Sequence, residues 1–187
     1  MNATSNDLNQ AFNDVSASSA GGAPFLIAYG LTFFITAILS LFISRSATAL
    51  VAMFQGAVAL PLAFWLERKI GSSRMAPDNP LRSLSIQMAM SQALGLPALI
   101  LVYSLNPAGI PLALASLGGI HFLPYAWLHR TRIYIAFAII VSIGAFAIQL
   151  FLRPIAFSSI LLFVAVVYWI TAPLVYRHAA SPVKDGG

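Results

Sequence analysis

The sequence contains no cysteine, which excludes disulfide bonds, thiolate metal sites, cysteine nucleophiles and palmitoylation. Acidic residues are almost as scarce, with five Asp and Glu in 187 residues. The chain also lacks an HExxH motif, a GxSxG elbow and a glycine-rich phosphate loop. We therefore expect no cofactor and no metal site, and nothing in the sequence favours an enzyme.

Charge of either sign is rare, and apolar residues dominate. Charged residues make up 8% of the chain and hydrophobic residues 59%, whereas soluble domains carry roughly 25% charged residues. This composition predicts an all-α polytopic membrane protein whose main partner is the lipid bilayer. The net charge of +5 does not indicate a nucleic-acid partner, because the basic residues are spread over the loops and do not form a stripe.

Six apolar runs, each close to the ~20 residues that cross a bilayer, predict a six-helix transmembrane domain over residues 24–176. The expected spans are 24–44, 47–66, 84–105, 110–128, 133–152 and 154–176. The last two are separate spans because Arg153 and Pro154 form a plausible turn and a charge at mid-membrane would be costly. Two halves of three spans would allow an inverted repeat of the kind found in transporters, although the sequence supports one only weakly.

Polar segments flank this domain at both ends. In the N-terminal tail, residues 1–23, apolar side chains recur at helical spacing from Leu8 to Val15, so the tail is either a short amphipathic helix on the membrane surface or disordered. Residues 177–187 form a short C-terminal tail.

The basic residues predict the topology. Two of them, Arg45 and Arg153, fall on one side of the predicted bundle, and eight fall on the other: Arg68, Lys69, Arg74, Arg82, Arg130, Arg132, Arg177 and Lys184. Since short loops rich in Lys and Arg stay in the cytoplasm, this predicts a multi-pass inner-membrane protein with both termini cytoplasmic.

Polar side chains on several spans fall at one depth in the cytoplasmic half of the predicted bundle. They form a hypothetical ligand-binding layer of His121, Tyr125, Gln87, Gln92, Tyr29, Thr32 and Tyr168. His121 is the one side chain of the predicted spans that titrates near neutral pH, and ionisable groups inside membranes are often functional. Alternatively, a neutral His121 is structural and bonds Tyr125 or a glutamine of the third span.

The segment around His121 combines Gly118, Gly119 and Pro124, a combination that bends or breaks membrane helices beside binding sites and also in inert spans. The string HFLPYAWLHRTRIY resembles a segment of a small bacterial integral-membrane family known only as a domain of unknown function. The resemblance is carried by His121, Phe122, Leu123, Pro124, Tyr125, Trp127 and Tyr134. It implies a bacterial inner-membrane protein and no particular activity, and the His129-Arg130 pair departs from the Tyr and Lys usual in that family.

Three functions remain open from the sequence. The first is a transporter or channel for a small neutral or weakly charged solute, with the polar layer as its site. The second is a non-catalytic membrane regulator or assembly partner, for which a homo-oligomer would be one arrangement. The third and weakest is a lipid-modifying enzyme in which His129, Arg130 and Arg132, with Arg68 and Lys69, hold a lipid phosphate.

Overall fold

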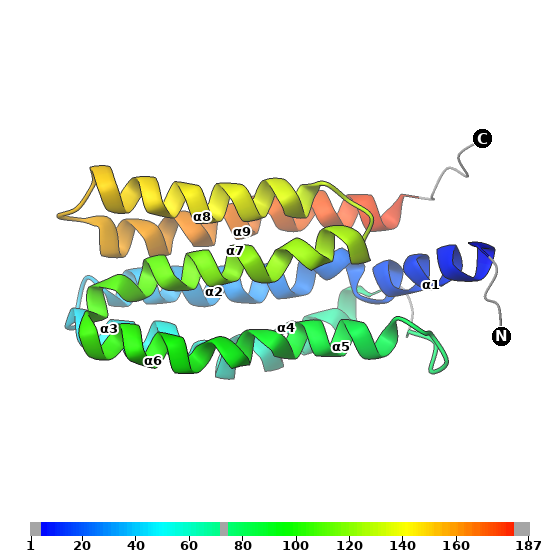
Figure 1. Cartoon of the computed structure of the whole chain (residues 1–187), viewed down its shortest axis with the longest axis horizontal. Helices are drawn as coiled ribbons and strands as arrows, with labels where there is room; N and C mark the ends of the chain where they lie inside the picture. Colours follow the sequence, from blue (N-terminus) through cyan, green and yellow to red (C-terminus); the bar gives the residue numbers. More distant parts are fainter. Residues whose placement is uncertain (1–4, 72–74, 182–187) are drawn as a thin grey trace.

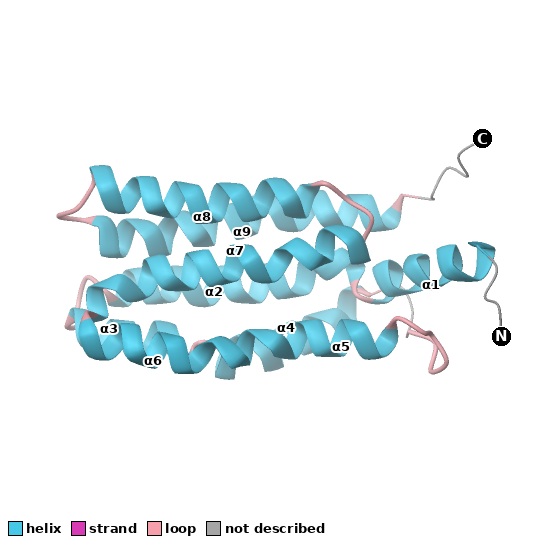
Figure 2. Ribbon diagram, in the orientation of Figure 1, coloured by secondary structure: helices cyan, strands magenta, loops and turns pink. Residues whose placement is uncertain are grey.

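The structure is a computed structural model that describes residues 5–71 and 75–181. Arg74 and Lys184, which belong to the predicted cytoplasmic cations, lie outside the described residues, as does the end of the predicted C-terminal tail. The described residues form helices and connecting turns without a strand (Figure 2). The elements are α1 Ser5–Ser18, η1 Ala20–Gly22, α2 Ala23–Leu39, α3 Arg45–Phe54, α4 Gly56–Ile70, α5 Arg82–Ser91, η2 Gln92–Gly95, α6 Leu96–Leu105, η3 Pro107–Gly109, α7 Ile110–Leu128, α8 Ile133–Phe151 and α9 Ala156–Ala180.

The predicted six-span helical fold is confirmed within the described residues. The helical stretches long and apolar enough to cross a membrane are Ala20–Leu39, Arg45–Ile70, Arg82–Leu105, Pro107–Leu128, Ile133–Phe151 and Ala156–Ala180. Two of them end later than predicted, because the second continues through Glu67 to Ile70 and the last continues to Ala180. The predicted turn at Arg153-Pro154 is present between α8 and α9.

The helices run side by side, so that their connections gather at two ends of the bundle (Figure 1). The N-terminal helix, the α4–α5 and α7–α8 connections and the end of α9 share one end, which we call the terminal end. The α2–α3, α6–α7 and α8–α9 connections lie at the opposite end, where the guanidinium of Arg45 donates a 3.5 Å hydrogen bond to the Pro154 carbonyl.

Helices α2, α7, α8 and α9 pack into a tight block around the main core. A stack of aromatic rings joins its helices, with Phe122 lying parallel to Tyr134 at 5.5 Å between centroids and edge-on to Phe137 at 4.9 Å. Close approach of α7 to α8 depends on Gly119, since a Cβ there would lie 2.9 Å from the Ala138 carbonyl oxygen and collide with the Ser142 hydroxyl. Gly119 therefore serves packing, and α7 continues unbroken through it.

The third span packs far less tightly. No residue of α5 or η2 is buried, and Leu99 is the buried residue of α6. The 3-10 turn at Gln92–Gly95 interrupts the span just before Pro97, which lacks an amide proton and cannot donate within the helix. The second span is similarly divided at Gln55, between α3 and α4. We call α5, η2 and α6 the outer layer, because they contact the tight block loosely, whereas α4 packs closely against α2.

The N-terminal segment forms a helix with one apolar face, but this face packs on protein. Ala11, Phe12 and Val15 of α1 are at most 5% exposed and form a second cluster with Leu81 and Leu128. Leu8, in contrast, is 42% exposed. Figure 1 shows α1 extending from the terminal end roughly along the bundle axis.

Polar contacts fix α1 to the α4–α5 loop. The Asn79 amide donates to the Ala11 carbonyl at 3.0 Å and to the Asp14 carboxylate at 2.7 Å, while the same carboxylate accepts from the Ala76 amide at 3.0 Å. A left-handed bend at Ala20, Gly21 and Gly22 then turns the chain into α2. The α1 helix is thus a docked part of the bundle end.

Candidate functional site

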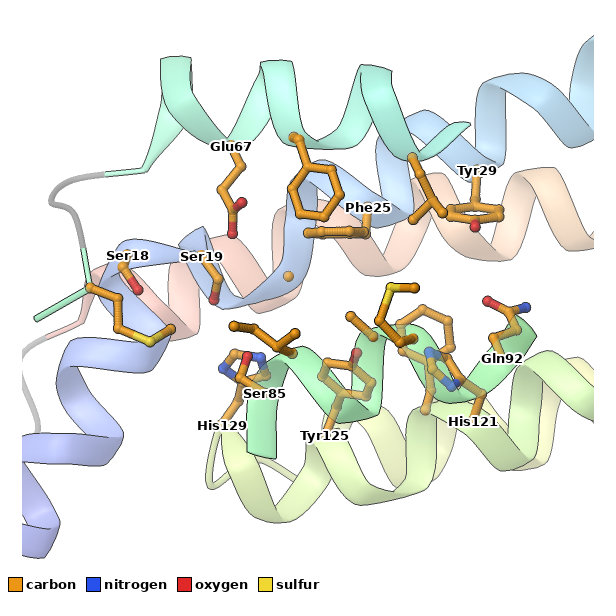
Figure 3. Close-up of a pocket in the computed structure, with 18 of the residues that line it drawn as sticks. Ser18, Ser19, Phe25, Tyr29, Glu67, Ser85, Gln92, His121, Tyr125 and His129 are labelled. Carbon is orange, nitrogen blue, oxygen red and sulfur yellow. The ribbon is translucent and has the colours of Figure 1, made fainter. Parts of the chain in front are cut away.

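A cavity of about 700 Å³ lies between the outer layer and the tight block near the terminal end (Figure 3). Its walls come from the helices α2, α4, α5 and α7, and the end of α1 and η1 closes one side. Its lining residues are Ser18, Ser19, Gly22, Phe25, Tyr29, Leu60, Phe64, Glu67, Arg68, Met75, Arg82, Ser85, Ile86, Ala89, Met90, Gln92, His121, Phe122, Tyr125, His129, Tyr134 and Tyr168. We call it the tyrosine cavity.

Helical spacing produces each wall. On α2 the lining side chains follow Gly22 at intervals of three and four residues, and on α4 Leu60, Phe64 and Glu67 share one face in the same way. On α5, Arg82, Ser85 and Ala89 repeat the pattern. The four faces meet because each helix turns its polar or aromatic stripe toward the others, away from the surrounding lipid.

Five of the seven side chains predicted for the ligand-binding layer line the tyrosine cavity: Tyr29, Gln92, His121, Tyr125 and Tyr168. Thr32 and Gln87 do not. The Thr32 hydroxyl donates to the Tyr29 carbonyl of its own helix at 3.0 Å, and the Gln87 amide donates to the Ser83 hydroxyl at 3.2 Å on an exposed face. Their depth along the helix agrees with the layer, but their direction around the helix does not.

His121 lies on the cavity wall and contacts the third span at Ser91. Its Nδ1 lies 3.3 Å from the Ser91 hydroxyl, and its ring meets Tyr125 edge-on at 5.5 Å between centroids without a hydrogen bond between the two side chains. A neutral imidazole held in this way presents its other edge to the cavity (Figure 3).

Aromatic faces dominate the cavity surface, contributed by Phe25, Tyr29, Phe64, Phe122, Tyr125, Tyr134 and Tyr168. The Tyr134 hydroxyl donates a hydrogen bond to the Gly21 carbonyl, so its proton is already used within the protein. Within the described part of the chain, the hydroxyls of Tyr29, Tyr125 and Tyr168 donate no hydrogen bond, so they are available to a molecule in the cavity.

The sequence analysis missed Glu67 as a lining residue. The second span was predicted to end at residue 66, but α4 extends to Ile70 and the half-buried Glu67 carboxylate points into the cavity (Figure 3). Its spacing from Leu60 and Phe64 was the available signal. Among the described residues no ion pair or hydrogen bond to this carboxylate is present, although Arg68 acts on it electrostatically.

The end of α1 meets the cavity at His129, which is 4% exposed. The Ser16 hydroxyl lies 3.1 Å from its Nδ1, and His178 Nε2 lies 3.2 Å from its carbonyl oxygen. Burial, together with the neighbouring His178, lowers the pKa of His129 to about 4, so its ring is neutral at physiological pH. His129 therefore supplies a neutral contact between α1 and the bundle.

The residues predicted to hold a lipid phosphate do not all line one space. Arg68 and His129 line the tyrosine cavity, His129 and Arg130 share a hollow beside α1, and Arg130 and Arg132 share a third hollow. The Arg130 guanidinium also lies over the Phe12 ring at 4.6 Å from its centroid. In residues 5–71 and 75–181, no three of His, Asp or Glu group closely enough to hold a metal ion. The site can bind a molecule through aromatic faces, hydroxyls and one carboxylate.

The fold places the protein in the class of polytopic α-helical membrane proteins, and its bundle encloses a cavity of about 700 Å³. The chain belongs to the family of unknown function DUF7010, whose match covers residues 8–178. This match confirms the resemblance that the segment around His121 carries. No curated protein and no solved structure shows measurable similarity to the chain.

Proposed function

We propose that this protein is a membrane transporter or channel for a small solute, which binds in the tyrosine cavity. The observation that carries the proposal is the cavity itself: about 700 Å³ within a membrane-spanning bundle. This volume falls within the roughly 300–1,000 Å³ typical of small-molecule sites, and a mostly apolar lining with a few convergent polar groups is their usual surface. A non-catalytic regulator would need no such space.

The position of the cavity suits a site that opens to one side of the membrane. Arg68 and Arg82 line the cavity and are exposed, so the cavity reaches the surface at the terminal end. His121 lies deeper, ~10 Å along α7 from the end of that helix at Leu128. Under the proposal the terminal end faces the cytoplasmic side of a bacterial inner membrane, because the connections at this end carry most of the basic residues.

The two walls of the cavity differ in a way that favours movement. The tight block supplies Phe122, Tyr134 and Tyr168 from a packed core, while α5 supplies a wall with no buried residue. Segments with few buried apolar contacts open at low free energy, and transport by alternating access requires one part of a bundle to move against another. We therefore assign α5 and α6 as the moving part.

The test is occlusion of the cavity in purified protein. Ala89 lines the cavity from α5, so Ala89→Trp should fill the space and abolish both solute-induced thermal stabilisation and uptake into proteoliposomes. The matched control is Ala136→Trp, since Ala136 on α8 is exposed and does not line the cavity. A library of small solutes of differing charge supplies the ligands.

Equal solute binding by the two tryptophan variants would contradict the proposal, provided that both elute as folded protein. Failure of every solute in the library to stabilise the unmodified protein would contradict it as well.

A further inference from the structure

We propose that the tyrosine cavity selects an amphipathic organic cation, with the Glu67 carboxylate as its counter-ion and aromatic rings as its walls. This inference rests on the proposed function and names the chemical class of the solute. It starts from Glu67, a half-buried carboxylate that points into the cavity and has no ion pair among the described residues.

A carboxylate in a partly desolvated space is costly unless a positive group or hydrogen-bond donors compensate it. In the described structure, the cation that acts on Glu67 is its neighbour Arg68, whose side chain is exposed and forms no ion pair with it. A cationic solute would supply the missing partner from inside the cavity, where the low dielectric makes the attraction stronger than at the surface.

The aromatic lining provides the second element of recognition. Glu67 and Phe25 face the same space as Tyr125, with Tyr29 deeper along α2 (Figure 3). The negative faces of such rings attract cations, and most strongly where water is excluded. Their apolar surfaces would hold the hydrophobic part of the solute at the same time.

Two arginines at the rim make an organic anion the competing class. Arg68 and Arg82 both line the cavity and would attract an anion by charge alone. Both side chains are exposed, so water and salt screen them, whereas the carboxylate is half-buried. Selection inside the cavity is therefore governed by Glu67, and the arginines act at its entrance.

The experiment compares two probes of the same shape and opposite charge, tetraphenylphosphonium and tetraphenylborate, by equilibrium binding to the purified full-length protein. The protein should bind the phosphonium ion more tightly than the borate ion. Glu67→Gln should weaken phosphonium binding by at least about tenfold, because it removes the counter-ion while keeping the side chain's shape. Borate binding should stay unchanged or tighten.

Two control variants make the result specific. Asp78→Asn removes one negative charge from an exposed position outside the cavity and should leave phosphonium binding unchanged. Ala89→Trp should abolish binding of the phosphonium ion, which separates cavity binding from uptake into detergent. Binding of borate by Glu67→Gln, with elution as a single folded species, shows that the variant keeps its cavity.

Tighter binding of borate than phosphonium, or phosphonium binding that Glu67→Gln leaves unchanged, would overturn the cation assignment. If neutral or anionic solutes bind in an Ala89-dependent way and phosphonium does not, the cation assignment fails while the proposed function stands. If nothing in the solute library binds either, both fail together.

Discussion

The tight block and the outer layer of the bundle both consist of helical stretches apolar enough to cross a membrane, yet they bury very different numbers of side chains. Helix α9 contributes ten buried residues, whereas α5 contributes none and α6 contributes Leu99. In a membrane, apolar surface gains little from leaving lipid for protein, so hydrophobicity alone does not determine packing. Close packing of shapes determines it, and the contacts among the rings of Phe122, Phe137 and Tyr168 provide it in the tight block.

The cavity forms where the tightly packed block meets the loosely packed outer layer. The rings of Phe122, Phe137 and Tyr168 hold the tight block in one arrangement, because each contacts the other two at 4.9–5.8 Å between centroids. The outer layer is interrupted at Gln92–Gly95 and does not follow the same surface closely. The space left between the rigid and the interrupted layer is the tyrosine cavity.

The largest difference in stability between the two regions should appear when a glycine in each is replaced by alanine. Gly119→Ala places a Cβ against the Ala138 carbonyl oxygen and the Ser142 hydroxyl in the tight block, and should cost about 1–3 kcal/mol of stability through overpacking. Gly95→Ala adds a Cβ at 3.4 Å from Leu117, an ordinary contact, and should change stability by less than ~1 kcal/mol, with a gain favoured by helix propensity.

The measurement is the thermal stability of both variants in the same detergent. A loss for Gly95→Ala as large as that for Gly119→Ala would show that the outer layer is packed as closely as the block.

A smaller effect on stability should come from lowering the pH, because it acts on the contact between α1 and a single side chain, His129. The pKa of His129 is lowered to about 4 in the folded protein, below the ordinary value of 6.5, so folding favours the neutral ring. Its contribution to stability is present above pH 6.5 and is lost as the pH falls toward 4. We expect a loss on the order of 1 kcal/mol at pH 5, confined to α1 and its contacts.

Hydrogen exchange measures this directly. After correction for intrinsic rates, the amides of α1 should exchange faster at pH 5 than at pH 7, while those of α9 near Val164 should not change. His129→Gln, which cannot ionise, should remove the difference even though His178 is retained. Protection of α1 that is equal at both pH values in the unmodified protein would contradict the assignment.

The sequence predicted the elements that follow from local patterns. The apolar runs located the spans because crossing a bilayer requires ~20 such residues, and Arg153-Pro154 marked a turn because a charged residue and a proline interrupt a buried helix. The spacing of Ala11, Phe12 and Val15 indicated an amphipathic helix, but not what it packs against. Its contacts come from Leu81 and Leu128, far away in the sequence.

The sequence gives the depth of a side chain along its helix but not its direction, and five of the seven side chains predicted for one layer line the cavity. A rise of ~1.5 Å per residue places Thr32 and Gln87 level with His121, whereas the direction of a side chain depends on how the helix packs. Thr32 turns to its own backbone and Gln87 to an exposed face. Glu67 was missed for a related reason, because the end of an apolar run does not show that the helix continues past it.

Under the proposed function, the space between the two layers is open to water and solutes, while the tight block is dry. Because the chain has no cysteine, single Cys variants test it without background. Ser85→Cys places a thiol on the cavity wall, and Thr36→Cys places one in the block at a position that is 2% exposed. Both substitutions nearly conserve side-chain volume.

The measurement is the rate of modification by a charged, water-soluble thiol reagent in membranes, with and without a solute that stabilises the protein. Ser85→Cys should react readily, the solute should protect it, and Thr36→Cys should not react. Modification of Ser85→Cys as slow as that of Thr36→Cys would contradict the proposed function, because the cavity would then be closed to the molecules it is proposed to bind.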